Sequence, residues 1–435
     1  RAHKMALAFK EDMKMRKKKG MLFLVGFLAL ALIAPVSAQQ TNLVELNTLS
    51  GPNNLDFLLQ RFQQLQTEKG IRVNVNVLPY GRDAVMKLVA SFMTGGTQYD
   101  VFVLDCIDVA QYASAGWLYP IDDLVPESYR KDIIPFAKDG MMFQGKWYGL
   151  PWASEWKSFV YNTTMLKKEG LTEFPKTWKD VVSYSQKLQK DKVVKYSTAF
   201  SWAQKECLVC DFVALAATFG GQFFDDNLNP LFNKGGAVDA LQWMIDSLYT
   251  YKIVDPASLM WTEDDVMAAM QQGDISYCLC WGGSPLVPMN NPDQSKVVGQ
   301  VDIGLMPSVD GKLPYTVAGP MGWAISKNTK HPKEAWEFVQ FMAGPEGSRI
   351  ALEKAGIAIG WKSIIEDPAI QKKFPELKKM AVQAQYIVNR PAVPWYHEFS
   401  SMLAEELHKA LTGKMTAQQA LDEAVAKTLE IKKAY

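Results

Sequence analysis

The chain reads GKWYGLPWASEWKSFVYN over residues 145–162, and this stretch decides how the rest of the sequence is interpreted. Turns at Gly145 and Gly149 precede an apolar, aromatic run that we expect to form a strand. Glu155 lies inside this run, on the same face as Phe159, because side chains alternate along a strand. A carboxylate in an apolar strand costs free energy unless something pairs with it.

Two interpretations of Glu155 follow. It either forms an ion pair with a nearby Lys or Arg, or it lies in a cleft and accepts hydrogen bonds from a polar ligand. In the second case, Trp152 or Trp156 packs against that ligand. The segment leaves both open, because perturbed acids also occur in structural networks.

The first 38 residues have the layout of a leader and signal peptide. A basic cluster ends at Lys19, an apolar run covers residues 21–34, and small residues fill positions 36–38. The apolar run is shorter than the ~20 residues that span a bilayer. We therefore expect cleavage after Ala38 and export of the mature chain to the periplasm.

The charge of the mature chain argues against a nucleic-acid partner. Residues 1–38 hold eight of the 47 Lys and Arg and two of the 46 Asp and Glu, so 39 basic and 44 acidic residues remain. An evenly mixed, mildly acidic surface lacks the clustered basic face that nucleic acids require. The length exceeds what one core usually holds, so we expect two domains.

The cysteines are better explained as buried free thiols than as a metal site. Cys207 and Cys210 are three apart on an expected helix, and Cys278 and Cys280 are two apart on one face of an expected strand. Zinc would favour two CxxC pairs, and the four histidines are scattered. Cys otherwise behaves as a small hydrophobe, so we expect no metal or cofactor. A disulfide within either pair remains open.

An alternation of strands and helices opens the mature chain. Strands are expected at residues 43–46, 73–77 and 100–105, with helical stripes at 55–65 and 85–92. This order implies a parallel sheet with helices on both faces. Ligands bind beyond the carboxyl ends of such strands, where Asn54, Tyr80 and Asp105 stand.

No motif of a known catalytic chemistry is present. The sequence contains no GxSxG, HExxH, Gly-rich phosphate loop or dinucleotide fingerprint. Asp105 and Glu155 could act as the two carboxylates of a glycosidase, so a periplasmic carbohydrate-processing enzyme remains an alternative.

Eight landmarks, the opening stretch among them, follow one another along the chain. They are YDVFVLD…GWLYPIDD, GKWYGLPWASEWKSFVYN, TWKDVVSYSQKL, FGGQFFDD, MQQGDISYCLCW, MGWAISKNTKHPKEAWEFVQFM, RPAVPWYHEF and LTGKMTAQQALDEA. Together they resemble the family 1 extracellular solute-binding proteins of ABC importers, the maltose/trehalose-type sugar binders. The resemblance covers nearly the whole mature chain.

The resemblance implies a two-lobed α/β fold, in which each lobe is a mostly parallel sheet flanked by helices and a hinge joins the lobes. Lobe 1 would hold residues 39–150 and 307–358, and lobe 2 residues 151–306 and 359–435. It further implies a monomer without enzymatic activity that binds a neutral mono- or oligosaccharide and delivers it to the membrane permease subunits of an ABC importer.

The resemblance also implies a set of ligand contacts. From lobe 1 these are Asn54, Tyr80, Asp105, Gly322 and Trp323, and from lobe 2 they are Glu155, Trp281 and Arg390. Family members often carry an acid in place of Asn54, and an aromatic residue and a glycine in place of Lys205 and Cys207. These two departures leave the identity of the sugar open.

Three of these contacts have a plainer alternative. Trp281 could be a core residue, Arg390 could pair with a glutamate across a loop, and Tyr80 could be a turn residue beside Pro79. A non-sugar solute such as a polyol is the remaining alternative ligand.

Overall fold

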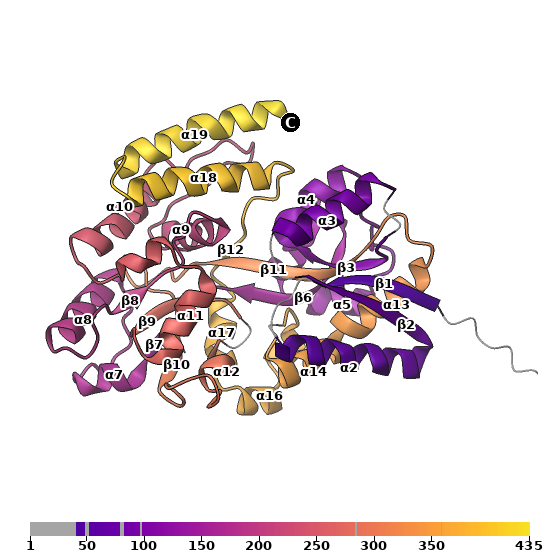
Figure 1. Cartoon of the computed structure of the whole chain (residues 1–435), viewed down its shortest axis with the longest axis horizontal. Coiled ribbons are helices and arrows are strands. Elements are labelled where there is room, and N and C mark those ends of the chain that lie inside the picture. The colour runs from indigo at the N-terminus through magenta and orange to yellow at the C-terminus, as the bar shows by residue number, and fades with distance from the viewer. Residues whose placement is uncertain (1–40, 48–51, 79–81, 96–97, 283–284, 358) are drawn as a thin grey trace, which may run out of the picture.

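The computed structural model describes residues 41–47, 52–78, 82–95, 98–282, 285–357 and 359–435. The predicted signal peptide and Tyr80 lie outside these residues, and the side chain of Asn54 is not described. Two main sheets, each flanked by helices, organise the described part of the chain (Figure 1). We call the larger sheet with its helices lobe 1, and the smaller sheet with its helices lobe 2.

The larger sheet has six strands, in the order β12-β11-β3-β1-β2, with β6 also paired to β11. Its strands are β1 (Thr41–Asn47), β2 (Ile71–Val77), β3 (Val101–Asp105), β6 (Gly149–Trp156), β11 (Thr316–Ile325) and β12 (Ile387–Val388). The expected parallel unit is confirmed, because β1 pairs in parallel with both β2 and β3. Strand β11 runs antiparallel to β3 and β6, so the whole sheet is mixed.

Helices cover the larger sheet because each carries an apolar stripe. In α2 (Pro52–Lys69), Leu58, Phe62 and Leu65 recur at helical spacing and are buried. The other helices that pack near this sheet are α3 (Arg82–Met93), α4 (Cys106–Ser114), α5 (Glu127–Asp132), α6 (Pro135–Gly140), α13 (Pro332–Ala343) and α14 (Pro345–Ala355). A small hairpin, β4 (Met142–Phe143) with β5 (Lys146–Trp147), precedes β6.

The smaller sheet has the order β10-β7-β9-β8. Its strands are β7 (Ser158–Asn162), β8 (Thr198–Ala199), β9 (Tyr277–Cys280) and β10 (Val301–Gly304). Only the β8–β9 pair is parallel, so the expectation of a mostly parallel sheet in lobe 2 is wrong. The reason is that β7 enters this sheet directly from the larger one and pairs antiparallel with both of its neighbours.

Helices of lobe 2 surround this sheet and form a second layer above it (Figure 1). They are α7 (Thr163–Lys168), α8 (Trp178–Lys190), α9 (Glu206–Thr218), α10 (Gly236–Tyr249), the 3₁₀ turn Pro256–Leu259, α11 (Glu263–Gln272), α12 (Leu286–Met289), α18 (Tyr396–Leu411) and α19 (Ala417–Ala434). Capping boxes begin α8 at Thr177 and α19 at Thr416, each followed three residues later by Asp180 or Gln419, a spacing that the sequence alone displays.

The chain changes sheets at Lys157, which separates β6 from β7. The run of residues 149–162 is therefore two strands in different sheets, and the expected shared face of Glu155 and Phe159 is wrong. The expected lobe boundary at 150/151 also falls inside β6, all of which belongs to the larger sheet. Residues 316–325 form one long strand, β11.

The segment after residue 358 starts in lobe 1, although the sequence places all of it in lobe 2. Trp361 forms a β-bridge with Ile133 and packs edge-on against Tyr129 at 4.9 Å between ring centroids. The short helices α15 (Lys362–Ile365), α16 (Pro368–Lys373) and α17 (Leu377–Gln383) follow, and then β12 of the larger sheet, before the chain reaches α18 of lobe 2.

Candidate functional site

A group of predicted site residues meets where the two sheets join. In the register of β6 and β11, Gly319 lies opposite Glu155. A Cβ atom on Gly319 would lie 3.0 Å from the ring of Trp281 and 3.1 Å from Nη2 of Arg390. The missing side chain of Gly319 thus lets an indole and a guanidinium from lobe 2 lie against a strand of lobe 1. The structure therefore brings Glu155, Trp281 and Arg390 together.

Glu155 is half-buried, and its carboxyl group has no hydrogen bond or ion pair with any residue in the described ranges. The ion-pair interpretation is therefore not what this part of the structure shows. Burial, and to a smaller extent the charge of Asp105, raise the pKa of Glu155 to about 7. Near neutral pH this carboxyl group can thus be present in either form, ready to accept or donate a hydrogen bond.

Asp105 ends β3 and begins α4, at the carboxyl edge of the parallel strands where the sequence places it. Its Oδ1 accepts a hydrogen bond from the backbone N–H of Ile107 at 3.2 Å, so it caps the helix. The same atom lies 3.7 Å from Nη2 of Arg390. Asp105 is buried, and its carboxylate is one half of a polar contact between the lobes.

Arg390 pairs with a glutamate, as the plainer alternative for this residue predicts. Its Nη1 donates to Oε1 of Glu206, at the start of α9, at 2.7 Å. The thiols of Cys210 and Cys106 lie 3.5 and 3.4 Å from its two Nη atoms. The guanidinium thus joins α9 of lobe 2 to the start of α4 in lobe 1, and its direct contact with a ligand stays a prediction.

Trp281 follows β9 and is only half-buried, so it is not a plain core residue. Its Nε1 donates a hydrogen bond to Oε1 of Glu263 at 3.3 Å. The ammonium of Lys157 lies 5.4 Å from the ring centroid. The carboxylate of Glu263 thus holds the edge of the indole ring, and the ammonium of Lys157 lies over its face.

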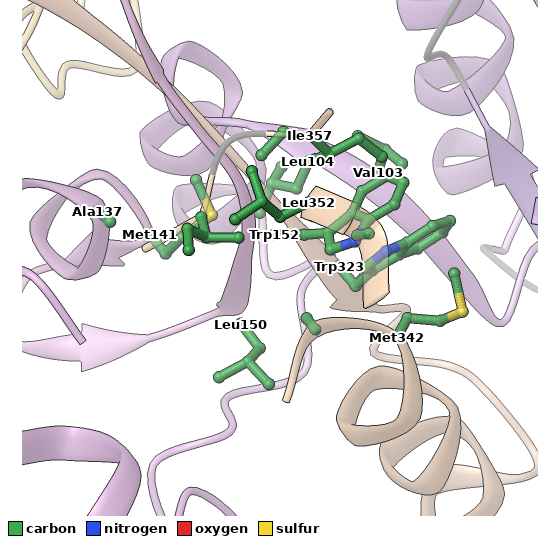
Figure 2. Packing of buried hydrophobic residues seen from close by; sticks show 14 of the residues in the cluster. Val103, Leu104, Ala137, Met141, Leu150, Trp152, Trp323, Met342, Leu352 and Ile357 are labelled. Carbon is green, nitrogen blue, oxygen red and sulfur yellow. The ribbon is translucent and has the colours of Figure 1, made fainter. Parts of the chain in front are cut away.

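Trp323 does not line a cleft, and the prediction that it contacts the ligand is wrong. Figure 2 shows it beside Trp152 in the packed core of lobe 1, where it has no exposed surface. Its ring lies 5.3 Å from Trp152 and 4.9 Å from Phe338 between centroids. The cause is α13, which carries Phe338 and covers this face of β11. Trp156 is buried as well, so neither Trp152 nor Trp156 serves as the ligand platform.

Gly322 has a packing role in the same sheet. A Cβ atom there would lie 2.6 Å from Sδ of Met141 and 2.8 Å from the carbonyl oxygen of Leu150. The sheet register also shifts between Met321 and Gly322. The close approach of these neighbours explains the glycine without a ligand.

Sequence reasoning missed four residues of this region: Lys157, Glu206, Glu263 and Gly319. Lys157 offered a signal, since a lysine beside the apolar run SFVYN needs a buried partner. Glu206 lies between Lys205 and Cys207, two of the positions that depart from the family pattern. Nothing in the sequence marked Glu263 or Gly319.

All five cysteines are free, which confirms the prediction of free thiols. The Sγ atoms of Cys278 and Cys280 lie 3.3 Å apart on one side of β9. Among the residues that the structure describes, no group of three or more His, Cys, Asp or Glu could hold a metal ion.

Comparison with known proteins assigns the family. The family described as bacterial extracellular solute-binding protein matches residues 51–349. The chain belongs to this family. Its members bind a solute outside the cytoplasm, so substrate binding is the role of this protein. None of the helices in the described ranges is long and apolar enough to cross a membrane.

Relatives and solved structures agree with this assignment. The mannitol-binding protein of Pseudomonas aeruginosa is 22% identical over 93% of this chain and 97% of its own length. The maltotriose-binding protein of Pyrococcus abyssi is 24% identical over 77% of this chain and 71% of its own length. A maltose-bound protein of T. maritima, MalE3, is 22% identical, has a TM-score of 0.82, and is matched over 91% of this chain and all of its own. The fold is thus the two-lobed α/β fold of periplasmic binding proteins.

Proposed function

We propose that this protein captures a neutral mono- or oligosaccharide between its two lobes and delivers it to the permease subunits of an ABC importer in the bacterial membrane. The observation that carries the proposal is the meeting of Glu155, Gly319 and Trp281 at the junction of the sheets. A carboxyl group without a partner among the described residues and a half-buried indole thus lie close together.

This pair of groups suits the surface of a sugar. A sugar ring has an apolar face, which packs well against an indole, and a rim of hydroxyl groups, which bond well to a carboxyl group. Hydrogen bonds to charged groups are worth about 1.5–3 kcal/mol each. Asp105 lies near enough to Glu155 to influence its pKa and offers a second carboxylate at the rim.

Relatives support a sugar or a sugar alcohol. Two of them are described as mannitol-binding and maltotriose-binding proteins. A related structure from Agrobacterium vitis, with a TM-score of 0.77 and 22% identity over 91% of this chain and 99% of its own, contains D-mannitol. A polyol is therefore the second candidate ligand, and one panel of compounds tests both.

The two lobes would close on the solute about the strands that join them. These joins lie at Lys157 between β6 and β7, at the start of β11, and beside β12, which pairs with β11 at Thr316 and Val317. Hinge closure of this kind assembles a site from both lobes. We propose that the mature chain acts as a monomer in the periplasm, without enzymatic activity.

A panel of neutral sugars and polyols tests the proposal. Maltose, maltotriose, D-mannitol, ribitol and D-tagatose are added to the mature chain, and the melting temperature and the heat of binding are measured. A ligand that binds only the folded state raises the melting temperature. Trp281→Ala and Glu155→Gln should each weaken the binding of a positive compound by about 1–3 kcal/mol. Val309→Ala, on an exposed loop, is the control.

Two further measurements separate the alternatives. Small-angle scattering should show a smaller radius of gyration with ligand, because the ligand contacts both lobes only in the closed form. Incubation with oligosaccharides should release no product. Steady turnover that disappears in Asp105→Asn or Glu155→Gln would support the carbohydrate-processing enzyme instead.

A further inference from the structure

Lys157 occupies the point at which the chain passes from the larger to the smaller sheet, and its backbone is held there by β11. Its N–H donates to the carbonyl oxygen of Val317 at 3.1 Å. Its own carbonyl oxygen accepts a hydrogen bond from Oγ1 of Thr316 at 2.6 Å. The backbone of Lys157 is therefore fixed to a second strand that joins the lobes.

The side chain of Lys157 enters lobe 2 and has no exposed surface. Its Nζ lies 2.5 Å from Oδ1 of Asp211 on α9, 3.0 Å from Oγ of Ser201 and 3.6 Å from Oε1 of Glu263 on α11. A buried ammonium is costly unless it is paired and hydrogen-bonded. Burial lowers the pKa of Lys157, but the attraction of Asp211 and Glu263 outweighs it, and the pKa is raised, so the group stays charged.

The second carboxylate oxygen of Asp211 completes this network. Its Oδ2 accepts hydrogen bonds from the N–H and the Oγ of Ser201, each at 2.9 Å. The pair of Lys157 and Asp211 is therefore anchored inside lobe 2, independently of any ligand.

The network ends at the indole of Trp281. The Nζ of Lys157 lies over the ring at 5.4 Å, and Oε1 of Glu263, the same atom that faces Lys157, accepts the hydrogen bond from the indole N–H. The ring is thus held at its face by a cation and at its edge by an anion. The cation is the side chain of Lys157, the residue at which the chain changes sheets. The anion is Glu263, whose carboxylate lies 3.6 Å from that ammonium.

We propose that Lys157 is a positioning residue for solute binding: together with Asp211 and Glu263 it sets the orientation of the Trp281 ring relative to the crossing strands. This inference rests on the proposed role of Trp281 as the platform for the solute. Lys157 itself touches no solute. Replacing Lys157 should weaken solute binding through the Trp281 ring. A ring that rotates freely must be ordered when the solute binds, and this ordering costs part of the binding free energy.

The test replaces the whole buried pair, because removal of one partner would leave an unpaired buried charge. The paired variant is Lys157→Met with Asp211→Asn. Glu263→Gln is a second, milder variant at a partly exposed position. Glu406→Gln is the matched control, since Glu406 is a buried acid paired with Lys427 at 2.6 Å between α18 and α19.

The first measurement needs no solute. The protein is labelled with 5-fluorotryptophan, and the ¹⁹F resonance of Trp281, one of 13 tryptophans, is assigned by its loss in Trp281→Phe. The paired variant and Glu263→Gln should shift or broaden this resonance, while those of Trp361 and Trp323 stay in place. Glu406→Gln should leave it unmoved. An unmoved Trp281 resonance in the paired variant overturns the positioning role, whether or not any sugar binds.

The second measurement is a double-mutant cycle, in which the affinities for maltotriose and D-mannitol are measured for each variant. The paired variant should weaken binding about tenfold with Trp281 present and less than about twofold in the Trp281→Ala background. Equal loss in both backgrounds overturns the inference, because the effect would then bypass the ring. If neither probe binds the unmodified chain, the proposed sugar binding fails, and the fluorine spectra still decide the role of Lys157.

Discussion

The imidazole of His397 on α18 lies 2.5 Å from the carboxylate of Asp108 on α4, measured from Nε2 to Oδ1. This contact joins a C-terminal helix of lobe 2 to the helix that follows β3 in lobe 1. A second contact between the lobes, that of Arg390 with Asp105, lies just before the same two helices in the chain, since Asp105 precedes α4 and Arg390 precedes α18. The lobes are thus linked by charged side chains as well as by the crossing strands, and one of these links can titrate near neutral pH.

The contact of His397 with Asp108 should make stability depend on pH. The hydrogen bond to Asp108, together with the charges of Asp108, Glu206 and Asp105, outweighs burial and raises the pKa of His397 above its usual 6.5. A raised histidine pKa contributes stability that is fully present below pH 6.5 and is lost as pH rises through the higher, folded-state pKa. His397→Gln should therefore lower the melting temperature more at pH 6 than at pH 9. A deficit that is the same at both pH values contradicts this.

Glu155 should also cost stability as the pH rises. Its pKa is raised to about 7 by burial and then by Asp105, so the folded state holds the proton more tightly than the unfolded chain does. The stability from the protonated group is present below its usual pKa and is lost as pH rises through about 7. Without ligand, Glu155→Gln should therefore gain stability relative to the unmodified chain between pH 5 and pH 8. The upper bound is about 3 kcal/mol, from 1.36 kcal/mol per pKa unit. Urea unfolding at the two pH values measures it, and Glu406→Gln is the control.

Trp323 should matter for stability and not for direct contact with the solute. Its side chain has no exposed surface and packs between Trp152 and Phe338, so Trp323→Ala leaves a cavity in lobe 1. The expected loss is about 3–5 kcal/mol in the free energy of unfolding. Trp323→Phe, which refills part of the space, should recover some of it. Trp281→Ala is the contrasting variant, with a small loss of stability and a large loss of affinity. Trp323 would not be a core residue, nor Trp281 a site residue, if Trp323→Ala mainly lowered affinity and Trp281→Ala mainly lowered stability. That result would falsify both assignments.

Any side chain at position 319 should displace a neighbouring group of the site. A Cβ atom there meets the Trp281 ring at 3.0 Å and Nη2 of Arg390 at 3.1 Å, so one of these groups must move. Gly319→Ala should weaken solute binding about three- to tenfold by calorimetry, since a displaced ring loses contact area. Ala318→Gly, at the neighbouring position of β11, is the control for a more flexible strand. Unchanged affinity in Gly319→Ala would show that the close approach has no role in binding.

Much of lobe 1 follows from local sequence patterns. The alternation of strand and helix over residues 41–105 gave the parallel unit, because hydrophobic periods of two and 3.6 residues fix which face of each element is buried. Asp105 at the end of β3 and the capping boxes at Thr177 and Thr416 were predictable for the same reason, since each depends on neighbours within a few residues.

The sequence by itself therefore determined the family, the order of the elements of lobe 1 and the place of Asp105 at the end of β3. Tertiary structure alone decided that Lys157 changes sheets, that Trp323 is covered by α13, and that Arg390 meets Glu206. The physical reason is separation along the chain. Arg390 and Glu206 are 184 residues apart, so their pairing depends on how whole lobes pack. The spacing of hydrophobic residues within one helix or strand carries no information about it.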